Sequence, residues 1–349
     1  SNTHITRFPM RNKLMNVFLA VGVVAIAVML CTFDVSYSEI WQNLKNAGWW
    51  FFAVVLVWIP IYAINAWSWR VIINNGNNGR RLPFWLVMKY TISGYALNYV
   101  TPVGVLGGEP YRIMELTPYY GAAKATSSVI LYAMMHIFSH FIFWAFSIGL
   151  YLIMYFNAIT TAMGIMLLIV AAFCCLGIYF FMKGYRNGLA MKTLKVFTHI
   201  PGLRRKARKF VEDKRETVER IDSQIAELHR QNKRTFYLSL FLEFAARIVG
   251  CLEIWFIFMI LTDSVSFWDC ILIQAFTSLF ANLFFFMPME MGTREGGFAL
   301  AVGGLAMSGA FGVLAGLLTR VRELIWVAIG ILLIKIGKTG KTSQSKSNA

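Results

Sequence analysis

Six long apolar runs constrain this chain more than any other feature of its sequence. A helix needs about 20 predominantly apolar residues to cross a bilayer. Hydrophobic residues make up 58% of the chain and charged residues 14%, against about 45–50% and 25% in a soluble domain. The sequence therefore predicts an all-α integral membrane protein. Six full transmembrane helices are expected, at about 14–33, 49–73, 126–156, 161–182, 236–262 and 309–335.

Two further apolar regions, 84–123 and 267–308, are each long enough for two passes but contain Pro and Gly near the middle. Because Lys and Arg concentrate in cytoplasmic loops, the charges near the span ends predict that both termini are cytoplasmic. Each interrupted region then begins and ends on one side of the membrane, and we predict two re-entrant helical hairpins. Irregular backbone at membrane depth is tolerated only where protein covers it or where it lines a wet cavity.

The two hairpin regions share a pattern in which Asn is followed by Pro, then by Gly, Glu and Arg. The order span, hairpin, span occurs twice, at about 49–156 and 236–335, and the loop charges give the two copies opposite topologies. This arrangement predicts an inverted repeat, in which substrate sites lie near the midplane between the repeats. We expect one polytopic membrane domain over residues 1–337 and a disordered tail over 338–349.

The linker 183–235 holds fifteen Lys or Arg and six Asp or Glu. In so apolar a chain this basic excess indicates that the linker is cytoplasmic, and it does not indicate nucleic-acid binding. One interpretation of the linker is a dimerising coiled coil, which would make a homodimer; the favoured one is an amphipathic elbow that contacts anionic lipid headgroups of the inner leaflet. Both depend on a narrow apolar stripe, formed by Val211, Val218, Ile221, Ile225 and Leu228.

The first hairpin carries the clearest chemistry. Pro102 ends an incoming half-helix and Pro110 suits the first turn of an outgoing one. The N-terminus of the outgoing half-helix would favour an anion, and the guanidinium of Arg112 offers a fork suited to phosphate. Glu109 would either hold Arg112 in place or carry a coupling proton.

The second hairpin and the last span extend this pattern. Arg294 and Glu295 would face the same cavity, whereas Arg320 and Arg322 lie too deep in the last span to reach the surface easily. Glu323 adjoins them. Internal salt bridges are the alternative interpretation, but four arginines, counting Arg112, against three glutamates leave one arginine over. We therefore favour an anion site, because ionisable groups inside a membrane are costly.

The predicted substrate-binding residues come from both hairpins and the last span. Neither a Walker loop, a nucleophile elbow, a zinc-hydrolase motif nor a dinucleotide fingerprint is present, so no enzymatic activity, catalytic residue or cofactor is expected. His136 and His140 have a helical spacing that a metal could use, but no third ligand adjoins them and no metal is expected. The predicted set is Asn98, Pro102, Gly107, Gly108, Glu109, Arg112, Asn282, Pro288, Arg294, Glu295, Gly296, Arg320, Arg322 and Glu323.

With these residues the sequence resembles the lysylphosphatidylglycerol synthase transmembrane family, a flippase-like family that includes the membrane half of the multiple peptide resistance factor. The resemblance covers about 10–337 and rests on the run from Asn98 to Arg112, on Gly292 to Gly296 and on Arg320. The bifunctional synthases carry a soluble domain after the membrane part. This chain ends at Ala349, so aminoacyl transfer is not expected.

The resemblance implies a lipid flippase of the bacterial cytoplasmic membrane. Its substrate would be an anionic or aminoacylated phospholipid, or a polyprenyl-linked lipid. Two alternatives remain open at this point: a transporter of a small soluble anion, and a non-transporting accessory subunit of a membrane glycosyltransferase or synthase.

Overall fold

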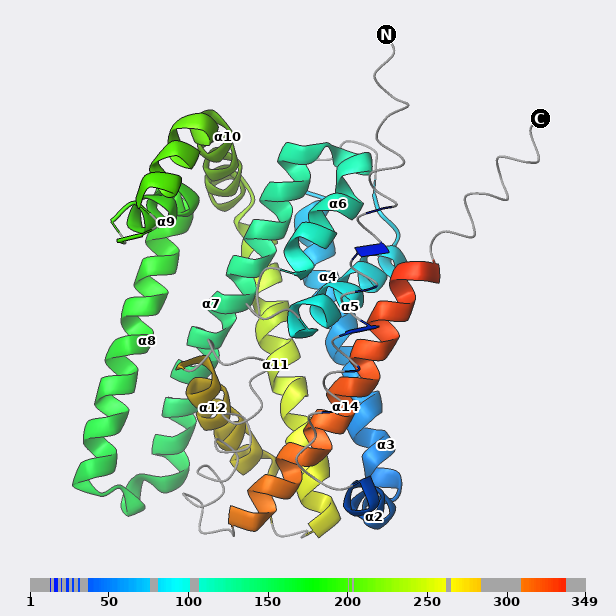
Figure 1. The fold of residues 1–349 in the computed structure, drawn as a ribbon. Coiled ribbons are helices and arrows are strands. Elements are labelled where there is room, and N and C mark those ends of the chain that lie inside the picture. Colours follow the sequence, from blue (N-terminus) through cyan, green and yellow to red (C-terminus); the bar gives the residue numbers. More distant parts are fainter. Residues whose placement is uncertain are drawn as a thin grey trace, which may run out of the picture. The chain divides into compact units, whose positions relative to one another are not determined.

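The chain is all helical wherever the computed structural model describes it (Figure 1). The described residues are 37–75, 81–100, 107–199, 201–202, 204–261, 265–283 and 309–336, with isolated positions between 13 and 31. Over these ranges no residue lies in a strand. The predicted all-α fold class is therefore confirmed for the described residues.

The helices follow the predicted spans closely. In chain order they are α2 Tyr37–Ala47, α3 Trp49–Leu56, α4 Trp58–Ile73, α5 Phe84–Val100, α6 Gly108–Tyr120, α7 Ala122–Tyr155, a 3-10 turn η1 Phe156–Ala158, α8 Thr161–Asn187, α9 Leu189–Phe197, α10 Arg204–Gln231, α11 Lys233–Leu261, α12 Phe267–Leu283 and α14 Gly309–Ile336.

Three helical runs are long and apolar enough to cross a membrane: Trp49–Ile73, Ala122–Tyr155 and Met163–Asn187. They match the second, third and fourth predicted spans. Helices α11 and α14, with 29 and 28 residues, occupy the fifth and sixth. Both interrupt their apolar sequence with buried charged residues, which lowers their hydropathy. The first predicted span falls largely outside the described residues.

Local chemistry explains the ends of these helices. The hydroxyl of Thr160 accepts a hydrogen bond from the Met163 N–H, 3.2 Å away, and so caps α8. Gly188, with φ of 85°, ends α8, and Gly121, with φ of 80°, separates α6 from α7. Glycine suits both points because a side chain is strained at positive φ.

In the first predicted hairpin region α5 ends at Val100 and α6 begins at Gly108. In the second region α12 forms the incoming helix. Residues 101–106 and 284–308, which include the tips of both hairpins, lie outside the described residues, as does the tail 338–349. The re-entrant path and the inverted repeat remain predictions.

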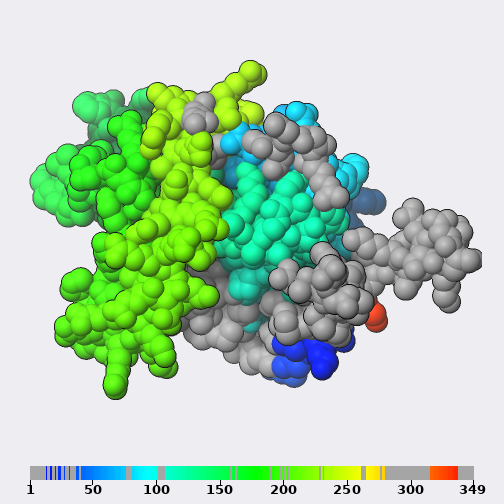
Figure 2. All heavy atoms as spheres, turned by 90° about the horizontal axis from the view of Figure 1, so that it is seen from above, coloured from blue at the N-terminus to red at the C-terminus, as the bar shows by residue number. Residues whose placement is uncertain are grey.

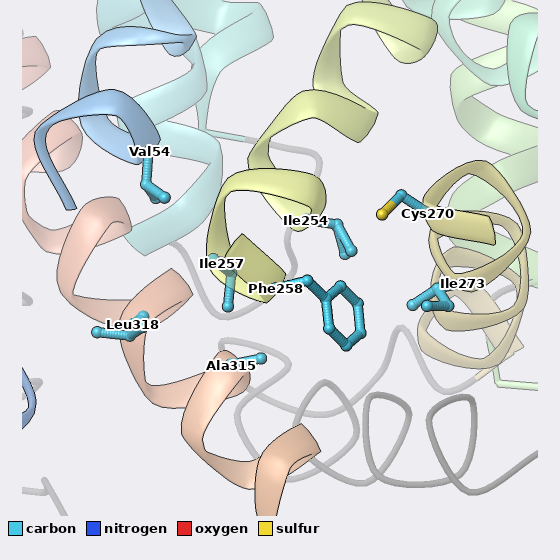
Figure 3. Packing of buried hydrophobic residues seen from close by; sticks show 8 residues of the cluster. All are labelled: Val54, Ile254, Ile257, Phe258, Cys270, Ile273, Ala315 and Leu318. Carbon is cyan, nitrogen blue, oxygen red and sulfur yellow. The ribbon is translucent and has the colours of Figure 1, made fainter. Parts of the chain in front are cut away.

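The chain divides into two compact units. Unit 1 consists of residues 1–63, 85–114 and 248–349, and unit 2 of 64–84 and 115–247. Within unit 1, helices α3, α11, α12 and α14 enclose an apolar cluster (Figure 3). Burial of such side chains from water and lipid fixes how these helices pack. The cluster comprises Val54, Ile254, Ile257, Phe258, Cys270, Ile273, Ala315 and Leu318.

In unit 2, α10 packs against α7, α8 and α9. Its apolar stripe supplies the contact: Val218, Ile221 and Ile225 are at most 7% exposed. These three residues of the stripe are therefore packed inside the unit. The opposite, charged face of α10 is exposed, and α10 lies at the surface in the view of Figure 2.

One carboxylate joins α10 to α9. Asp222 accepts hydrogen bonds from the Ala190 N–H at Oδ1 and from the Met191 N–H at Oδ2, each 2.8 Å long. These amides belong to the first turn of α9, where no helical partner is available. Asp222 thus caps α9 from another helix and compensates the positive end of its dipole.

Candidate functional site

Arg112 is the centre of a polar cluster in unit 1, which we call the Arg112 cluster: Thr91, Gly94, Tyr95, Asn98, Gly108, Glu109 and Arg112. The Arg112 side chain is 1% exposed. Its Nη2 donates to the Thr91 carbonyl, 3.1 Å away, and its guanidinium lies 4.6 Å from the centre of the Tyr95 ring. Stacking on an aromatic ring stabilises a buried guanidinium.

Two glycines make room for this cluster. A Cβ atom at Gly94 would collide with the Arg112 guanidinium, and one at Gly108 would collide with the Gly94 carbonyl oxygen. Helices α5 and α6 therefore approach each other more closely than side chains would permit. The predicted site residue Gly108 has this steric role, and its neighbour Gly107 is also buried.

Asn98 connects the ends of α5 and α6. Its Oδ1 accepts a hydrogen bond of 2.7 Å from the Gly108 N–H, and its Nδ2 donates to Glu109 Oε1 at 3.1 Å. Glu109 Oε1 is also 3.6 Å from Arg112 Nη1. The other oxygen, Glu109 Oε2, is buried and has no hydrogen-bond partner within the described part of the chain. Four predicted residues, Asn98, Gly108, Glu109 and Arg112, therefore meet in one place.

A second buried cluster in unit 1, the Arg322 cluster, contains Trp58, Tyr99, Glu253, Arg322 and Glu323. Arg322 Nη2 lies 2.8 Å from Glu253 Oε1 and 3.7 Å from Glu323 Oε1. The Arg322 guanidinium is 4.1 Å from the centre of the Trp58 ring, and Trp58 Nε1 donates to Glu253 Oε2. The Tyr99 hydroxyl donates to Glu323 Oε2.

Aromatic rings join the two clusters within unit 1. The ring centre of Tyr62 is 5.8 Å from that of Tyr95 and 5.3 Å from that of Trp58. The guanidinium of Arg112 stacks on Tyr95, and that of Arg322 stacks on Trp58. Tyr62 also meets Trp326 edge to face at 5.1 Å. The two guanidiniums thus lie at opposite ends of a row of three aromatic rings.

The structure corrects the charge count made from the sequence. That count omitted Glu253, which pairs with Arg322. Among the described residues of unit 1, Arg112, Arg320 and Arg322 are matched by Glu109, Glu253 and Glu323. The arginine surplus is therefore no longer an argument for an anion. Glu253 is visible in the sequence as a carboxylate beside Arg247 in the fifth predicted span. Nothing in the sequence identifies Arg322, 69 residues away, as its partner.

The other predicted residues fall into two groups. Arg320 lies on α14 beside the Arg322 cluster and is 6% exposed. Asn282 lies in α12, and its side chain is outside the described part. Outside the described residues altogether are Pro102, Pro288, Arg294, Glu295 and Gly296.

Comparison with known proteins agrees with these features. Residues 17–330 match the family model described as the lysylphosphatidylglycerol synthase TM region. No curated protein and no solved structure matches the sequence. The family match covers most of the chain and includes every described helix of both units except the last residues of α14. The chain therefore belongs to the lysylphosphatidylglycerol synthase transmembrane family and is a multi-pass membrane protein.

Proposed function

We propose that this protein is a flippase that moves a polar or anionic lipid between the leaflets of the bacterial cytoplasmic membrane. The substrate class is a phospholipid, an aminoacyl-phospholipid or a polyprenyl-linked lipid, each with a phosphate near its headgroup. Family membership supports this class of function. The proposal involves transport alone, with no enzymatic step and no cofactor.

One observation carries the proposal: the two buried arginine clusters differ in how tightly their charges are paired. Arg322 and Glu253 are 2.8 Å apart, the length of a charge-assisted hydrogen bond, about 2.7–2.9 Å. Arg112 and Glu109 are 3.6 Å apart, and Glu109 Oε2 accepts no hydrogen bond from any residue described. A loose pair can be exchanged for a ligand phosphate at lower cost than a tight one.

We therefore assign different roles to the two clusters. The Arg112 cluster binds the lipid phosphate, with the arginine fork on the phosphate and Glu109 returning to Arg112 when the lipid leaves. The Arg322 cluster holds the helices of unit 1 together. Arg294 and Glu295 are expected to supply the corresponding contacts from the second hairpin. Pro102, Asn282, Pro288 and Gly296 would shape the two hairpin tips, and Arg320 would add positive charge.

The test is leaflet exchange of labelled phospholipids and short polyprenyl phosphates in proteoliposomes. Arg112→Ala should abolish exchange, and Arg112→Lys should retain only part of it because an ammonium cannot form the bidentate contact. Arg81→Ala, at an exposed arginine just before α5, is the matched control and should exchange lipid as the wild type does. Full exchange by Arg112→Ala would overturn the proposed site.

The same experiment separates the alternatives. Release of an entrapped soluble anion without lipid exchange would favour a small-anion transporter. Absence of both activities in a folded protein, together with stable co-purification of a membrane glycosyltransferase or synthase, would favour an accessory subunit.

We also propose that the exposed face of α10 contacts anionic headgroups of the cytoplasmic leaflet, with both chain termini on that side. Its first half, 204–217, contains seven Lys or Arg and three Asp or Glu. A surface pocket of about 530 Å³ is lined there by Gly202, Arg204, Arg205, Arg208, Lys209 and Glu212. Binding to vesicles should therefore increase with their content of anionic lipid and decrease with salt.

A further inference from the structure

Unit 2 contains a buried pair of titratable groups that has no part in the proposed lipid site. His136 on α7 and Glu243 on α11 are joined by a contact of 2.9 Å between Nδ1 and Oε2. The Glu243 side chain is 0% exposed and the His136 side chain 32%. Helix α7 is one of the runs able to cross a membrane, where such groups are costly and mark functional sites.

Arg247, one turn after Glu243 on α11, is engaged elsewhere. Its Nη2 donates to the His136 carbonyl oxygen at 2.6 Å, and its Nε donates to the Ser139 hydroxyl at 2.7 Å. These bonds fix α11 against α7. The oxygen Glu243 Oε1 is buried and accepts no hydrogen bond from a described residue. The carboxylate thus has one oxygen on the imidazole and one that is unsatisfied.

The charges of this group are balanced only when the imidazole is neutral. Glu243 and Arg247 carry one negative and one positive charge, so a neutral His136 makes the group neutral. In that state the His136 Nδ1–H donates to Glu243, and Nε2 is the acceptor for a proton. Uptake of one proton from water forms one N–H bond and raises the net charge of the group by one.

Other ionisable groups lie on α7 itself and on the helices packed against it. The Nδ1 atom of His140 is buried and has no hydrogen-bond partner among the described residues. His140 packs edge to face on His136, with 5.7 Å between ring centres, and stacks near Trp144. On α8, Lys183 lies over the ring of Tyr179, and on α10 Asp222 caps α9. Trp69, in the part of α4 that belongs to unit 2, is uncharged, and its ring contacts the ring of Tyr132. The Tyr132 ring in turn contacts the His136 ring.

We propose that the His136–Glu243 pair is a proton-binding site, and that protons bound there couple lipid movement to a transmembrane proton gradient. The coupling rests on the proposed flippase function, whereas proton binding does not. His136 is the member of the pair that takes up the proton, and the fully buried Glu243 stabilises the imidazolium that forms.

Proton binding can be measured without transport. The full chain, labelled with ¹⁵N-histidine and held in lipid nanodiscs, is followed by NMR from about pH 5 to about pH 8, the range in which histidine ordinarily titrates. His136→Gln identifies the His136 signal among the five histidines. At about pH 6, the wild type should show a larger imidazolium fraction at His136 than Glu243→Gln does.

Two further variants keep this test decisive. Glu243→Asp retains the negative charge and should behave like the wild type, which guards against a folding defect in Glu243→Gln. Glu227→Gln removes an exposed carboxylate of α10 in the same unit and should leave the His136 signal unchanged. A His136 signal that stays neutral over the whole range, or one that is identical in Glu243→Gln, overturns the site.

Coupling is tested by lipid exchange in proteoliposomes with and without an imposed pH gradient. The gradient should change the rate several-fold in the wild type, and this dependence should be lost in His136→Gln and Glu243→Gln. If the wild type exchanges lipid at the same rate with and without the gradient, the proposed coupling is overturned, whereas the proposed flippase function is not. Absence of exchange in every protein would instead overturn the proposed function, while the NMR result would still decide proton binding.

Discussion

Arg322 and Glu253 form the tightest buried ion pair described in unit 1, with 2.8 Å between Nη2 and Oε1 and both side chains 6% exposed. The pair joins α14 to α11. Trp58 completes it by stacking on the guanidinium and donating to the second carboxylate oxygen. Because each charge compensates the other, loss of one partner would leave an isolated charge in a medium that solvates it poorly.

Arg322→Met and Glu253→Gln should therefore each lower the free energy of unfolding by about 3–5 kcal/mol. The double variant Arg322→Met/Glu253→Met should recover much of that loss, since no buried charge remains. Chemical denaturation in detergent micelles measures these changes. The exposed pair of Arg220 and Glu216, 59% and 90% exposed, is the control, and Glu216→Gln should cost less than about 1 kcal/mol. Equal effects of Glu253→Gln and Glu216→Gln would contradict the structural role.

Gly108→Ala should destabilise unit 1 and impair lipid exchange. The new Cβ would collide with the Gly94 carbonyl oxygen, and backbone cannot move aside as a side chain tip can. Overpacking of this kind costs about 1–3 kcal/mol. Gly149→Ala is the matched control, because a Cβ at this position in α7 meets nothing within 4 Å. Thermal unfolding and exchange rates of the two variants check the prediction, and similar behaviour of both would refute it.

Asp222→Ala should loosen α9. The change removes both hydrogen bonds to the first turn of that helix, and the loss of a helix cap costs about 1 kcal/mol. Cleavage by a protease near Gly188 should become faster, because the first turn of α9 frays more often. Asp213→Ala, an exposed carboxylate on the same helix, should leave the cleavage rate unchanged. Unchanged cleavage in Asp222→Ala would mean that packing alone holds α9 in place.

The stability of the linker region should decrease in mild acid because of His229. Burial lowers the pKa of His229, and the positive charges of Arg186 and Lys233 lower it further. Histidine in the unfolded chain has a pKa of about 6.5. Just below that pH, His229 is protonated in the unfolded chain but stays neutral in the folded chain. The contribution to stability is complete above that pKa and is lost as the pH falls toward the folded pKa.

Thermal unfolding at about pH 8 and about pH 5.5 tests this, since the two values lie on either side of the unfolded histidine pKa. His229→Phe keeps an aromatic ring against Phe236, 4.9 Å away between ring centres, and should weaken the pH dependence. His199→Gln, at an exposed histidine, should not. An unchanged pH dependence in His229→Phe would assign the acid sensitivity to other groups.

Much of the fold could be predicted from the sequence because the signals are local. A run of apolar residues predicts a spanning helix at any position in the chain. The second, third and fourth predicted spans coincide with helical runs that are long and apolar enough to cross a membrane. Arg112 and Glu109 could also be paired in advance, since residues three apart on one helix are neighbours. The start of α6 at Gly108 agrees with the outgoing half-helix that Pro110 predicted.

Long-range pairing could not be predicted in the same way. Glu253 and Arg322 are 69 residues apart, and His136 and Glu243 are 107 apart. Their chemistry says that each needs a partner but does not say which one. The apolar stripe of α10 fitted both a dimer and an elbow. The sequence could not say that Val218, Ile221 and Ile225 pack against other helices of the same unit.

The sequence by itself thus determined that this is an all-helical membrane protein of a particular family, because hydropathy and short motifs depend on neighbouring residues. The tertiary structure decided which buried charges compensate each other. It showed one arginine held tightly by Glu253 and another held loosely by Glu109. The tight pair joins α14 to α11, whereas the loose pair lies within α6. The two pairs differ by about 1 Å in length, and an ion pair inside a membrane is sensitive to distance on that scale.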